Sequence, residues 1–304
     1  MDTFRRNVIL LLLVISAFSL LSCKKKEGES TYKDAKDNSV LNLGATADFR
    51  YSGLEAVIIP EFEAQSGVKV KIRLYDDQAA LNQALRDKNV PMDLALGISS
   101  DFYRAFEQES LFREYDSTKT RRISQELIFE RQMRYVPYAQ SYLAILYNTR
   151  LITHPPASFG QLQDDKYFSQ IALINPDEDE IGKACEAWFI KLFGETGMAQ
   201  MEKALRKNVY RRYDKAEHAL DAVKKGEVAL TIAPASIPGY LEDIENNSIL
   251  GFKTFSGGRY YLSRGLAIPK RSKNLIAAEE FIEYMLSDTA QRMVVYKTSL
   301  GSVF

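Results

Sequence analysis

The segment YVPYAQSYLAILYN, residues 135–148, decides the fold of this chain. Its aromatic and aliphatic composition favours an extended strand, and Pro137 and Ser141 interrupt the segment in its middle. We interpret it as a connection that passes from one compact lobe to a second. A long strand predicted over residues 260–268 carries the chain back into the first lobe. Two extended crossovers of this kind predict a body made of two lobes.

On the N-terminal side of this segment, short strands alternate with amphipathic helices. Apolar side chains recur at helical spacing around Leu81 and Leu85, whereas residues 68–74 alternate with a period of two, as a half-buried strand does. The order of the elements predicts a βαβαβ unit with a mostly parallel sheet. Its predicted strands are 40–46, 68–74 and 93–96, and its predicted helices are 54–65, which Gly67 ends, one that begins at Asp76 and Asp77, and one that begins at Phe102 after a turn at Gly97.

The same alternation continues beyond the central segment, so the predicted fold class is α/β in both lobes. An apolar stripe that includes Cys185 and Trp188 predicts a helix from Ile181 to Gly194, with both side chains in the core. We expect lobe 1 to comprise residues 40–138 and 260–304, and lobe 2 to comprise residues 139–259. The other predicted elements are strands 170–175, 209–213 and 228–233 with helices 198–205 and 216–223 in lobe 2, and helices 274–286 and 288–296 in lobe 1.

The first 22 residues have the organisation of an export signal. Arg5 and Arg6 supply a charged start, and the largely apolar run 8–21 is too short to cross a hydrocarbon core, which needs about 20 helical residues. Cys23 follows, and the segment resembles a bacterial lipoprotein signal peptide. Cleavage would leave Cys23 to carry acyl chains such as palmitate, with residues 23–39 as a tether to a membrane, facing the periplasm or the exterior. An ordinary secretory signal with an incidental cysteine is the alternative.

Composition argues against several classes of function. The 40 basic and 40 acidic residues balance, so no basic excess favours nucleic acid. Cys185 is the only cysteine apart from Cys23, so we expect no disulfide in the folded part. His154 and His218, the only histidines, lie in polar segments, and no familiar catalytic or phosphate-binding motif is present. We therefore expect neither an enzyme nor a bound cofactor or metal.

Several short motifs follow one another along residues 40–303. They are FEA (62–64), GVKV (67–70), MDLALG (92–97), VPY (136–138), YN (147–148), PASF (156–159), GE (226–227), PGY (238–240) and FIEYMLS (281–287). Their order and spacing resemble those of the two-lobed extracellular solute-binding proteins of ABC importers, in the branch that includes thiamine-binding and ferric-iron-binding proteins. The resemblance implies a type II periplasmic-binding-protein fold and a monomer. It also implies a permease and its ATPase as partners.

The resemblance places a solute between the lobes, at loops that follow strands and precede helices. It implies neutralisation of a cationic solute by Asp48 and by one of the acids 177–180, with stacking on Tyr240 and Tyr213. A place for Tyr213 in the core is the alternative. The substrate-binding residues implied in this way are Thr46, Asp48, Phe49, Ser99, Ser100, Gln140, Tyr142, Asp177, Glu178, Tyr213, Ser236 and Tyr240.

The chain departs from the thiamine-binding branch at the ligand positions. Ala216, Pro234 and Ser299 occupy positions at which that family stacks aromatic rings on its ligand. Four carboxylates, residues 177–180, stand where that family has hydroxyl residues suited to a phosphate. Acids at a helix N-terminus complement the helix dipole, which is a purely structural explanation, whereas the functional explanation is a rim that attracts a cation. The best hypothesis is a small cationic nutrient, thiamine.

Other ligands and another class of protein stay open. Ferric iron is one alternative because its binders use adjacent tyrosines, as Tyr260 and Tyr261 are. Neighbouring residues of a strand point to opposite faces, however, and cannot share one metal. A polyamine is a further alternative, and a surface interaction lipoprotein that has lost solute binding is the alternative of a different class. The family usually continues for some tens of residues beyond Phe304.

Overall fold

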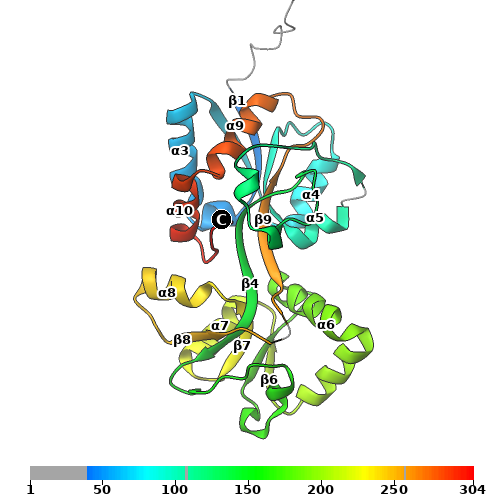
Figure 1. The fold of residues 1–304 in the computed structure, drawn as a ribbon, viewed down its shortest axis with the longest axis vertical. Coiled ribbons are helices and arrows are strands. Elements are labelled where there is room, and N and C mark those ends of the chain that lie inside the picture. The colour runs from blue at the N-terminus through cyan, green and yellow to red at the C-terminus, as the bar shows by residue number, and fades with distance from the viewer. Residues whose placement is uncertain (1–39, 107–108, 257) are drawn as a thin grey trace, which may run out of the picture. The chain divides into compact units, whose positions relative to one another are not determined.

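The computed structural model describes residues 40–106, 109–256 and 258–304 (Figure 1). The predicted signal peptide, Cys23 and the predicted tether lie outside these residues. Within the described ranges, no helix combines the length and the apolar character that crossing a lipid bilayer requires. The described strands form one nine-stranded sheet, in the order β2-β1-β3-β9-β4-β7-β5-β6 with β8 beside β4, which two lobes share.

Lobe 1 is built around three parallel strands. Its elements are β1 (Val40–Thr46), α2 (Asp48–Tyr51), α3 (Leu54–Ser66), β2 (Lys69–Tyr75), α4 (Gln78–Arg86), β3 (Leu94–Ser99), α5 (Ser100–Phe106), the short 3₁₀ helices Thr120–Arg122 and Gln125–Leu127, α9 (Leu275–Met285) and α10 (Asp288–Lys297). Helices α3, α9 and α10 cover one face of the sheet, and α4 and α5 cover the other (Figure 1). This arrangement confirms the predicted βαβαβ unit.

Lobe 2 repeats the sandwich of helices around a sheet. Its elements are the 3₁₀ helices Gly160–Gln163 and Asp165–Tyr167, β5 (Ile171–Ile174), α6 (Glu180–Leu205), β6 (Val209–Tyr213), α7 (Ala216–Lys225), β7 (Leu230–Pro234), α8 (Ile237–Glu245) and β8 (Leu250–Lys253). Helix α6 packs on one face of the sheet, and α7 and α8 pack on the other. Trp188 is 1% exposed and contacts Phe159 and Phe255, as expected for the core of this lobe.

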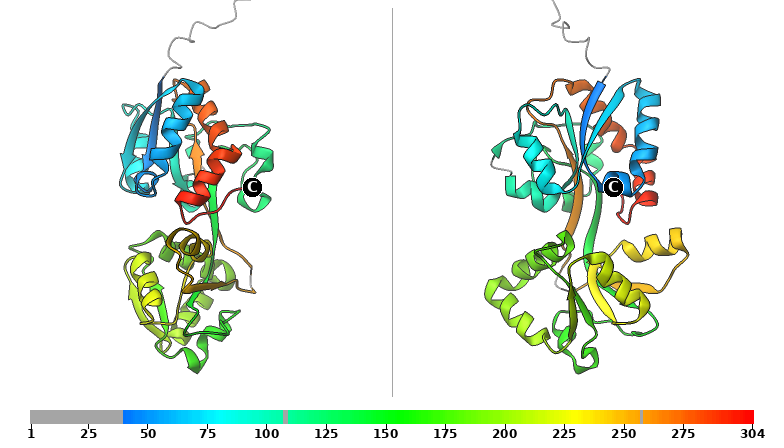
Figure 2. Two further views of the ribbon diagram at one scale, coloured as in Figure 1. Left: turned by 90° about the vertical axis from the view of Figure 1, so that its left-hand side faces the viewer. Right: turned by 180° about the vertical axis from the view of Figure 1, so that it is seen from behind.

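Two strands, β4 (Val136–Asn148) and β9 (Tyr261–Ala267), join the lobes (Figures 1 and 2). They pair with each other antiparallel, from Val136 opposite Leu266 to Tyr142 opposite Tyr261. Strand β9 also pairs with β3 in lobe 1, and the far end of β4 pairs with β7 and β8 in lobe 2. The predicted parallel pairing is found within each lobe, whereas every pair that involves β4 or β9 is antiparallel.

The central segment is less broken than its sequence predicts. Strand β4 runs through all 13 of its residues, and Ser141 pairs regularly with Leu262. Only Pro137 has a local effect, because the register with β9 shifts between Pro137 and Ala139. Proline lacks the N–H group that a ladder requires, and a bulge of one residue accommodates it without ending the strand.

One predicted boundary near a glycine also differs from the structure, whereas a second is confirmed. Strand β3 continues beyond the predicted turn to Ser99, because Gly97 forms a bulge with φ +87° and the ladder resumes at Ile98. A Cβ atom at Gly97 would collide with the side chain of Thr46, so only glycine fits at this position. At Gly194 the backbone angles φ +69° and ψ 169° are not helical, so α6 consists of two helical segments on either side of a kink, as the sequence predicts. Helices α2 and α8 and strand β8 were not predicted from the sequence.

The carboxylate of Asp93 connects three chain segments inside lobe 1. One oxygen accepts hydrogen bonds from the backbone and amide nitrogens of Asn42 in β1, at 3.0 and 2.7 Å. The other accepts from the backbone N–H groups of Lys273 and Asn274, at 2.9 and 3.1 Å, at the start of α9. Burial by itself raises the pKa of Asp93, but these hydrogen bonds outweigh burial and lower the pKa below its ordinary value.

We predict that Asp93→Asn destabilises the protein by about 3 kcal/mol, because the new amide group faces N–H donors and leaves them unpaired. The pKa of Asp93 is lower in the folded protein than in the unfolded chain, where it is about 3.9. The ionised carboxylate therefore stabilises the fold fully above about pH 3.9, and this stabilisation is lost as the pH falls through the folded pKa. Urea unfolding at neutral pH measures the effect. The exposed Asp116→Asn variant is the control, and equal midpoints for the two variants would contradict the prediction.

Candidate functional site

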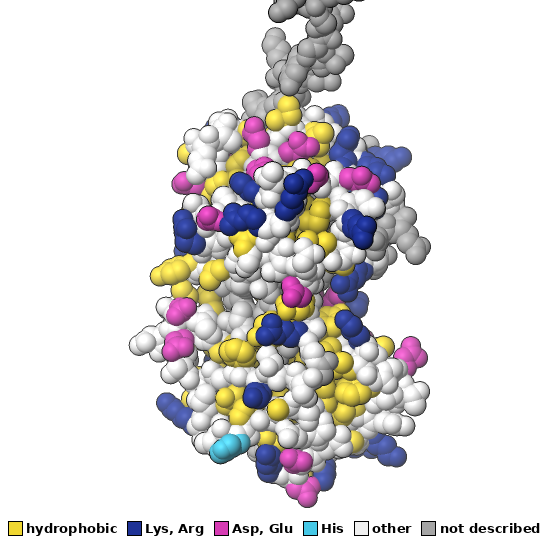
Figure 3. Space-filling model, viewed as in Figure 1, with side chains coloured by type: hydrophobic (Ala, Val, Ile, Leu, Met, Phe, Trp, Pro, Cys, Tyr) yellow, Lys and Arg dark blue, Asp and Glu magenta, His cyan; other side chains and the backbone are white. Residues whose placement is uncertain are grey.

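A cavity of about 910 Å³ lies between the two lobes. The starts of α2, α4 and α5 form its wall in lobe 1, and the loop before α6 together with the first turns of α6, α7 and α8 forms most of its wall in lobe 2. The crossover strands contribute residues 138–139 and 262–264, and the chain after α10 contributes residues 298–300. A narrowing of the surface between the lobes is visible in the space-filling view (Figure 3). Strand ends and helix starts therefore converge here, which is typical of ligand sites in α/β proteins.

The structure brings seven of the twelve predicted site residues to this cavity. Asp48 and Phe49 begin α2 directly after β1, and Ser99 and Ser100 lie where β3 passes into α5. Gln78 holds that junction in place, since its amide donates to the carbonyl oxygen of Gly97 at 2.7 Å and accepts from the N–H of Ser99 at 3.2 Å. The predicted residues that line the cavity are Asp48, Phe49, Ser99, Ser100, Asp177, Glu178 and Tyr240.

The other five predicted residues do not line the cavity. Thr46 is buried and donates a hydrogen bond to the carboxylate of Asp48. Tyr213 is buried in the core of lobe 2, which was the alternative position for it. The hydroxyl of Ser236 donates to the carbonyl oxygen of Ser299, which does line the cavity. Thr46 and Ser236 therefore hold wall residues in place.

Gln140 and Tyr142 lie on the crossover strand but away from the cavity. The amide of Gln140 donates to the carbonyl oxygen of Ser302 at 3.1 Å and so fixes the last residues of the chain. The ring of Tyr142 packs edge to face on Tyr261 at 6.0 Å, and the guanidinium of Arg259 lies 4.5 Å from its centre. Both side chains therefore pack around the crossover strands β4 and β9, which act as the hinge between the lobes in the type II fold.

The acidic cluster before α6 divides into residues with different roles. Asp179 caps α6 by accepting from the N–H of Ile181 at 2.8 Å, and its other oxygen accepts from the N–H of Ala216 at 3.0 Å, at the start of α7. The structural explanation therefore holds for Asp179. The carboxylates of Asp177 and Glu178 are exposed and have no hydrogen-bonding or ionic partner among the described residues. These two acids remain open to a ligand.

Arg264 is the main cavity residue that was not predicted from the sequence. It lies on β9, and its guanidinium is 2.6 Å from the carboxylate of Glu180 in lobe 2 and 3.6 Å from that of Asp48 in lobe 1. Burial by itself lowers the pKa of this guanidinium, but the two carboxylates outweigh burial and raise it. Arg264 is the only charged residue of the predicted strand 260–268, and this single charge in an otherwise uncharged strand was the available signal.

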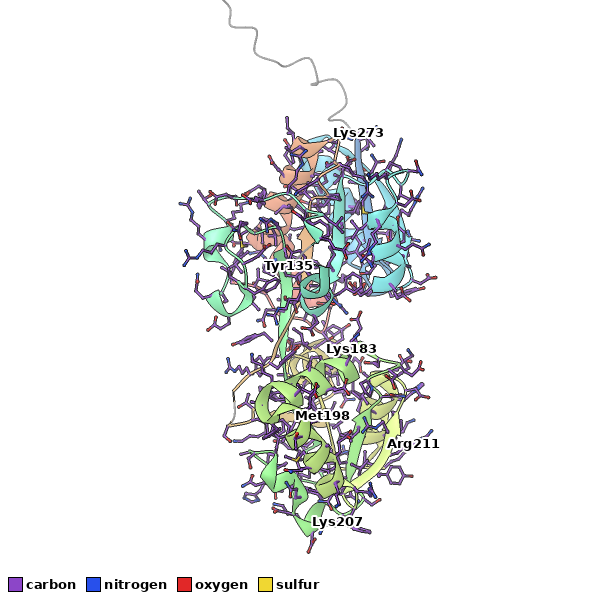
Figure 4. The ribbon with its side chains drawn as sticks, turned by 90° about the vertical axis from the view of Figure 1, so that its right-hand side faces the viewer. Tyr135, Lys183, Met198, Lys207, Arg211 and Lys273 are labelled. Carbon is purple, nitrogen blue, oxygen red and sulfur yellow. The ribbon has the colours of Figure 1, made fainter. Side chains whose placement is uncertain are left out.

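Most of the charged residues that line the cavity are acidic. Seven carboxyl groups line it against three basic groups, which are Lys183, Arg264 and Lys297. Figure 4 places Lys183 at the end of lobe 2 nearest lobe 1, with Lys207 and Arg211 farther away. Three of the acids come from lobe 1: Asp48 begins α2, Asp77 caps α4, and Asp101 in α5 accepts a hydrogen bond from Tyr260 at 3.0 Å. An excess of carboxylates favours a cation over an anion.

The adjacent tyrosines Tyr260 and Tyr261 face different neighbours. The hydroxyl of Tyr260 bonds to Asp101, whereas that of Tyr261 accepts a hydrogen bond from Arg259 at 3.3 Å. Among the described residues, no group of three or more His, Cys, Asp or Glu side chains is placed to hold a metal ion. The geometry of this pair therefore does not support the iron alternative.

Two lobes joined by paired crossover strands, with a cavity between them that is lined by more acidic than basic residues, define a solute-binding protein. Residues 89–302 match the family of bacterial extracellular solute-binding proteins, and the chain belongs to this family. This result confirms the fold class and the family that the sequence motifs indicated.

Curated relatives of this chain carry a more specific description. The thiamine-binding periplasmic protein of Salmonella typhimurium is 24% identical over 239 residues, which are 77% of this chain and 71% of the relative. The thiamine-binding periplasmic protein of Escherichia coli (strain K12) is 24% identical over 242 residues, which are 78% of this chain and 72% of the relative.

Solved structures share the fold at low sequence identity. A periplasmic thiamin-binding protein has a TM-score of 0.72 and 22% identity, and the alignment covers 87% of this chain and 83% of the other. The apo ferric ion-binding protein A of Pasteurella haemolytica has a TM-score of 0.73 and 18% identity, with 87% and 85% covered. The spermidine/putrescine substrate-binding protein of Streptococcus pneumoniae has a TM-score of 0.70 and 18% identity, with 85% and 81% covered.

We predict that Asp179→Ala lowers the free energy of unfolding by about 1–2 kcal/mol, because two helix N-termini lose a cap. Asp177→Ala should leave the stability nearly unchanged, since its carboxylate has no partner among the described residues. Urea unfolding of both variants measures the difference. Equal loss of stability in the two variants would show that the division of the acidic cluster is incorrect.

Proposed function

We propose that this protein captures a small cationic nutrient, with thiamine as the best candidate, and delivers it to an ABC permease that an ATPase drives. The observation that carries the proposal is the cavity between the lobes, whose seven carboxyl groups outnumber its three basic groups. The lobes in this proposal are residues 40–138 with 260–304 and residues 139–259. Separate hydrophobic cores support the division into two lobes, although Ala139 packs in a core of lobe 1 and Tyr260 in a core of lobe 2. No bond is made or broken, and the protein works as a monomer.

Binding in this proposal depends on closure of the lobes over the solute. Closure removes water from the cavity, which strengthens the attraction between a cation and the carboxylates of Asp48, Asp177 and Glu178. The half-buried ring of Tyr240 offers a face for a cation–π contact of about 0.5–2 kcal/mol. Ser99 and Ser100 on the opposite wall supply hydrogen bonds that orient the solute.

The relatives named above support thiamine, and one difference from them shapes the site. Ala216, Pro234 and Ser299, at positions where the thiamine-binding branch carries rings, all line the cavity. Their small side chains leave Tyr240 as the main aromatic wall in lobe 2. We therefore propose that charge contributes more, and stacking less, to the binding of thiamine by this protein than by those relatives.

A polyamine is the second candidate. Acidic side chains that line the cavity come from both lobes, with Asp48, Asp77 and Asp101 on one side and Asp177 and Glu178 on the other. Charges separated in this way suit a ligand with an ammonium group at each end. Failure of both ligands to bind would instead favour a surface interaction lipoprotein that has lost solute binding.

We predict that thiamine binds in calorimetric titration and that Tyr240→Ala weakens it about tenfold, or about 1.4 kcal/mol, by removing the ring face. Tyr210→Ala, which removes an exposed ring on β6 that does not line the cavity, is the control and should bind as the parent protein does. No heat with thiamine at micromolar protein would count against thiamine. An unchanged dissociation constant for Tyr240→Ala would remove this residue from the site.

The export signal and Cys23 support a second part of the proposal, a lipid anchor that holds the protein to a membrane outside the cytoplasm. We predict that Cys23→Ala abolishes the incorporation of labelled palmitate and moves the protein from the membrane fraction to the soluble fraction, because stable anchoring needs the acyl chains. Cys185→Ala is the control and should keep the label. Retention of Cys23→Ala in washed membranes would contradict the anchor.

A further inference from the structure

Arg264 occupies a position in the cavity that none of the predicted site residues shares. It lies on β9 between β3 and β4, opposite Ser99 on one side and Ala139 on the other. From this strand its guanidinium reaches the first residue of α2 in lobe 1 and the first residue of α6 in lobe 2, at 3.6 and 2.6 Å. We call the space between the carboxylates of Asp48 and Glu180 the cation site. Arg264 fills it.

The carboxylates of the cation site are more accessible than the group that fills it. The side chains of Asp48 and Glu180 are 53% and 49% exposed, whereas that of Arg264 is 23% exposed. Ion pairs as exposed as these change an equilibrium constant by a factor of about five at most. Arg264 can therefore leave at low cost, and a solute in the cavity can reach both carboxylates.

The other two basic residues of the cavity behave differently. Lys183 and Lys297 line the wall but have no carboxylate partner among the described residues. Asp48 is also held in place, because Thr46 donates a hydrogen bond to its other oxygen. The cation site is thus a preformed pair of carboxylates, one from each lobe, that bind a guanidinium supplied by the hinge.

We propose that Arg264 stands in for the cationic group of the solute, so that a cationic solute binds by displacing its guanidinium from Asp48 and Glu180. This inference rests on the proposed function and deepens it. Arg264 is then a specificity-determining residue. A cation that only takes over the contacts with Asp48 and Glu180 gains nothing over the guanidinium, so a solute must make further contacts elsewhere in the cavity in order to displace it. Simple ammonium ions, which gain no such contacts, do not displace the guanidinium of Arg264.

The first test uses free guanidinium ion as the probe and needs no knowledge of the nutrient. Arg264→Ala vacates the cation site, so guanidinium should bind at millimolar concentration and shift the amide resonances of Asp48 and Glu180. The parent protein and the Lys183→Ala variant, which loses the same charge but keeps Arg264, should show shifts at least tenfold smaller. Adding Glu180→Gln to Arg264→Ala should abolish binding. Absence of binding to a folded Arg264→Ala protein would overturn the inference.

The second test is calorimetric titration with thiamine. Arg264→Gln should bind thiamine about tenfold more tightly than the parent protein, because two ion pairs no longer compete, whereas Glu180→Gln should bind more weakly. Weaker or unchanged binding by Arg264→Gln would overturn the inference and leave the proposed function standing. Guanidinium binding to Arg264→Ala without any heat from thiamine would reject thiamine and uphold the cation site.

Discussion

The antiparallel pairing of β4 with β9 is the interaction on which the remainder of the structure depends. These strands join the sheets of the two lobes, and β9 lies between β3 and β4, so lobe 1 contains a strand that returns from lobe 2. Hinged folds concentrate their motion in a few extended residues of this kind. Because Tyr138 and Arg264 lie on these strands and line the cavity, the hinge and the site share residues.

Electrostatics then decides what such a cavity can hold. Helix N-termini ordinarily favour anions, yet the starts of α2, α4, α5 and α6 carry acids here. Asp179 and Asp77 satisfy backbone N–H groups as caps, so their charges are partly used within the fold. Asp177 and Glu178 are not used in this way among the described residues. The distinction between capping acids and free acids is what makes a cationic solute the best match.

Sequence patterns predicted most of the fold because local chemistry sets most of it. The boundaries of β1 and β6 agree residue for residue with the prediction, and α7, α9 and α10 lie where their apolar stripes place them. The failures have a tertiary cause. Gly97 looks like a chain break, but a bulge beside Thr46 lets β3 continue to Ser99. Arg264 was missed because its partners come from α2 and α6, distant in sequence.

A crystal structure of the protein grown with thiamine is the most direct test of solute capture between the lobes. We expect thiamine in the cavity, with its positively charged ring within about 4 Å of a carboxylate oxygen of Asp48 or Glu180, the ring of Tyr240 against it, and the guanidinium of Arg264 turned away. Thiamine bound on the outer surface of either lobe, or a cavity that stays empty at saturating thiamine, would contradict the account.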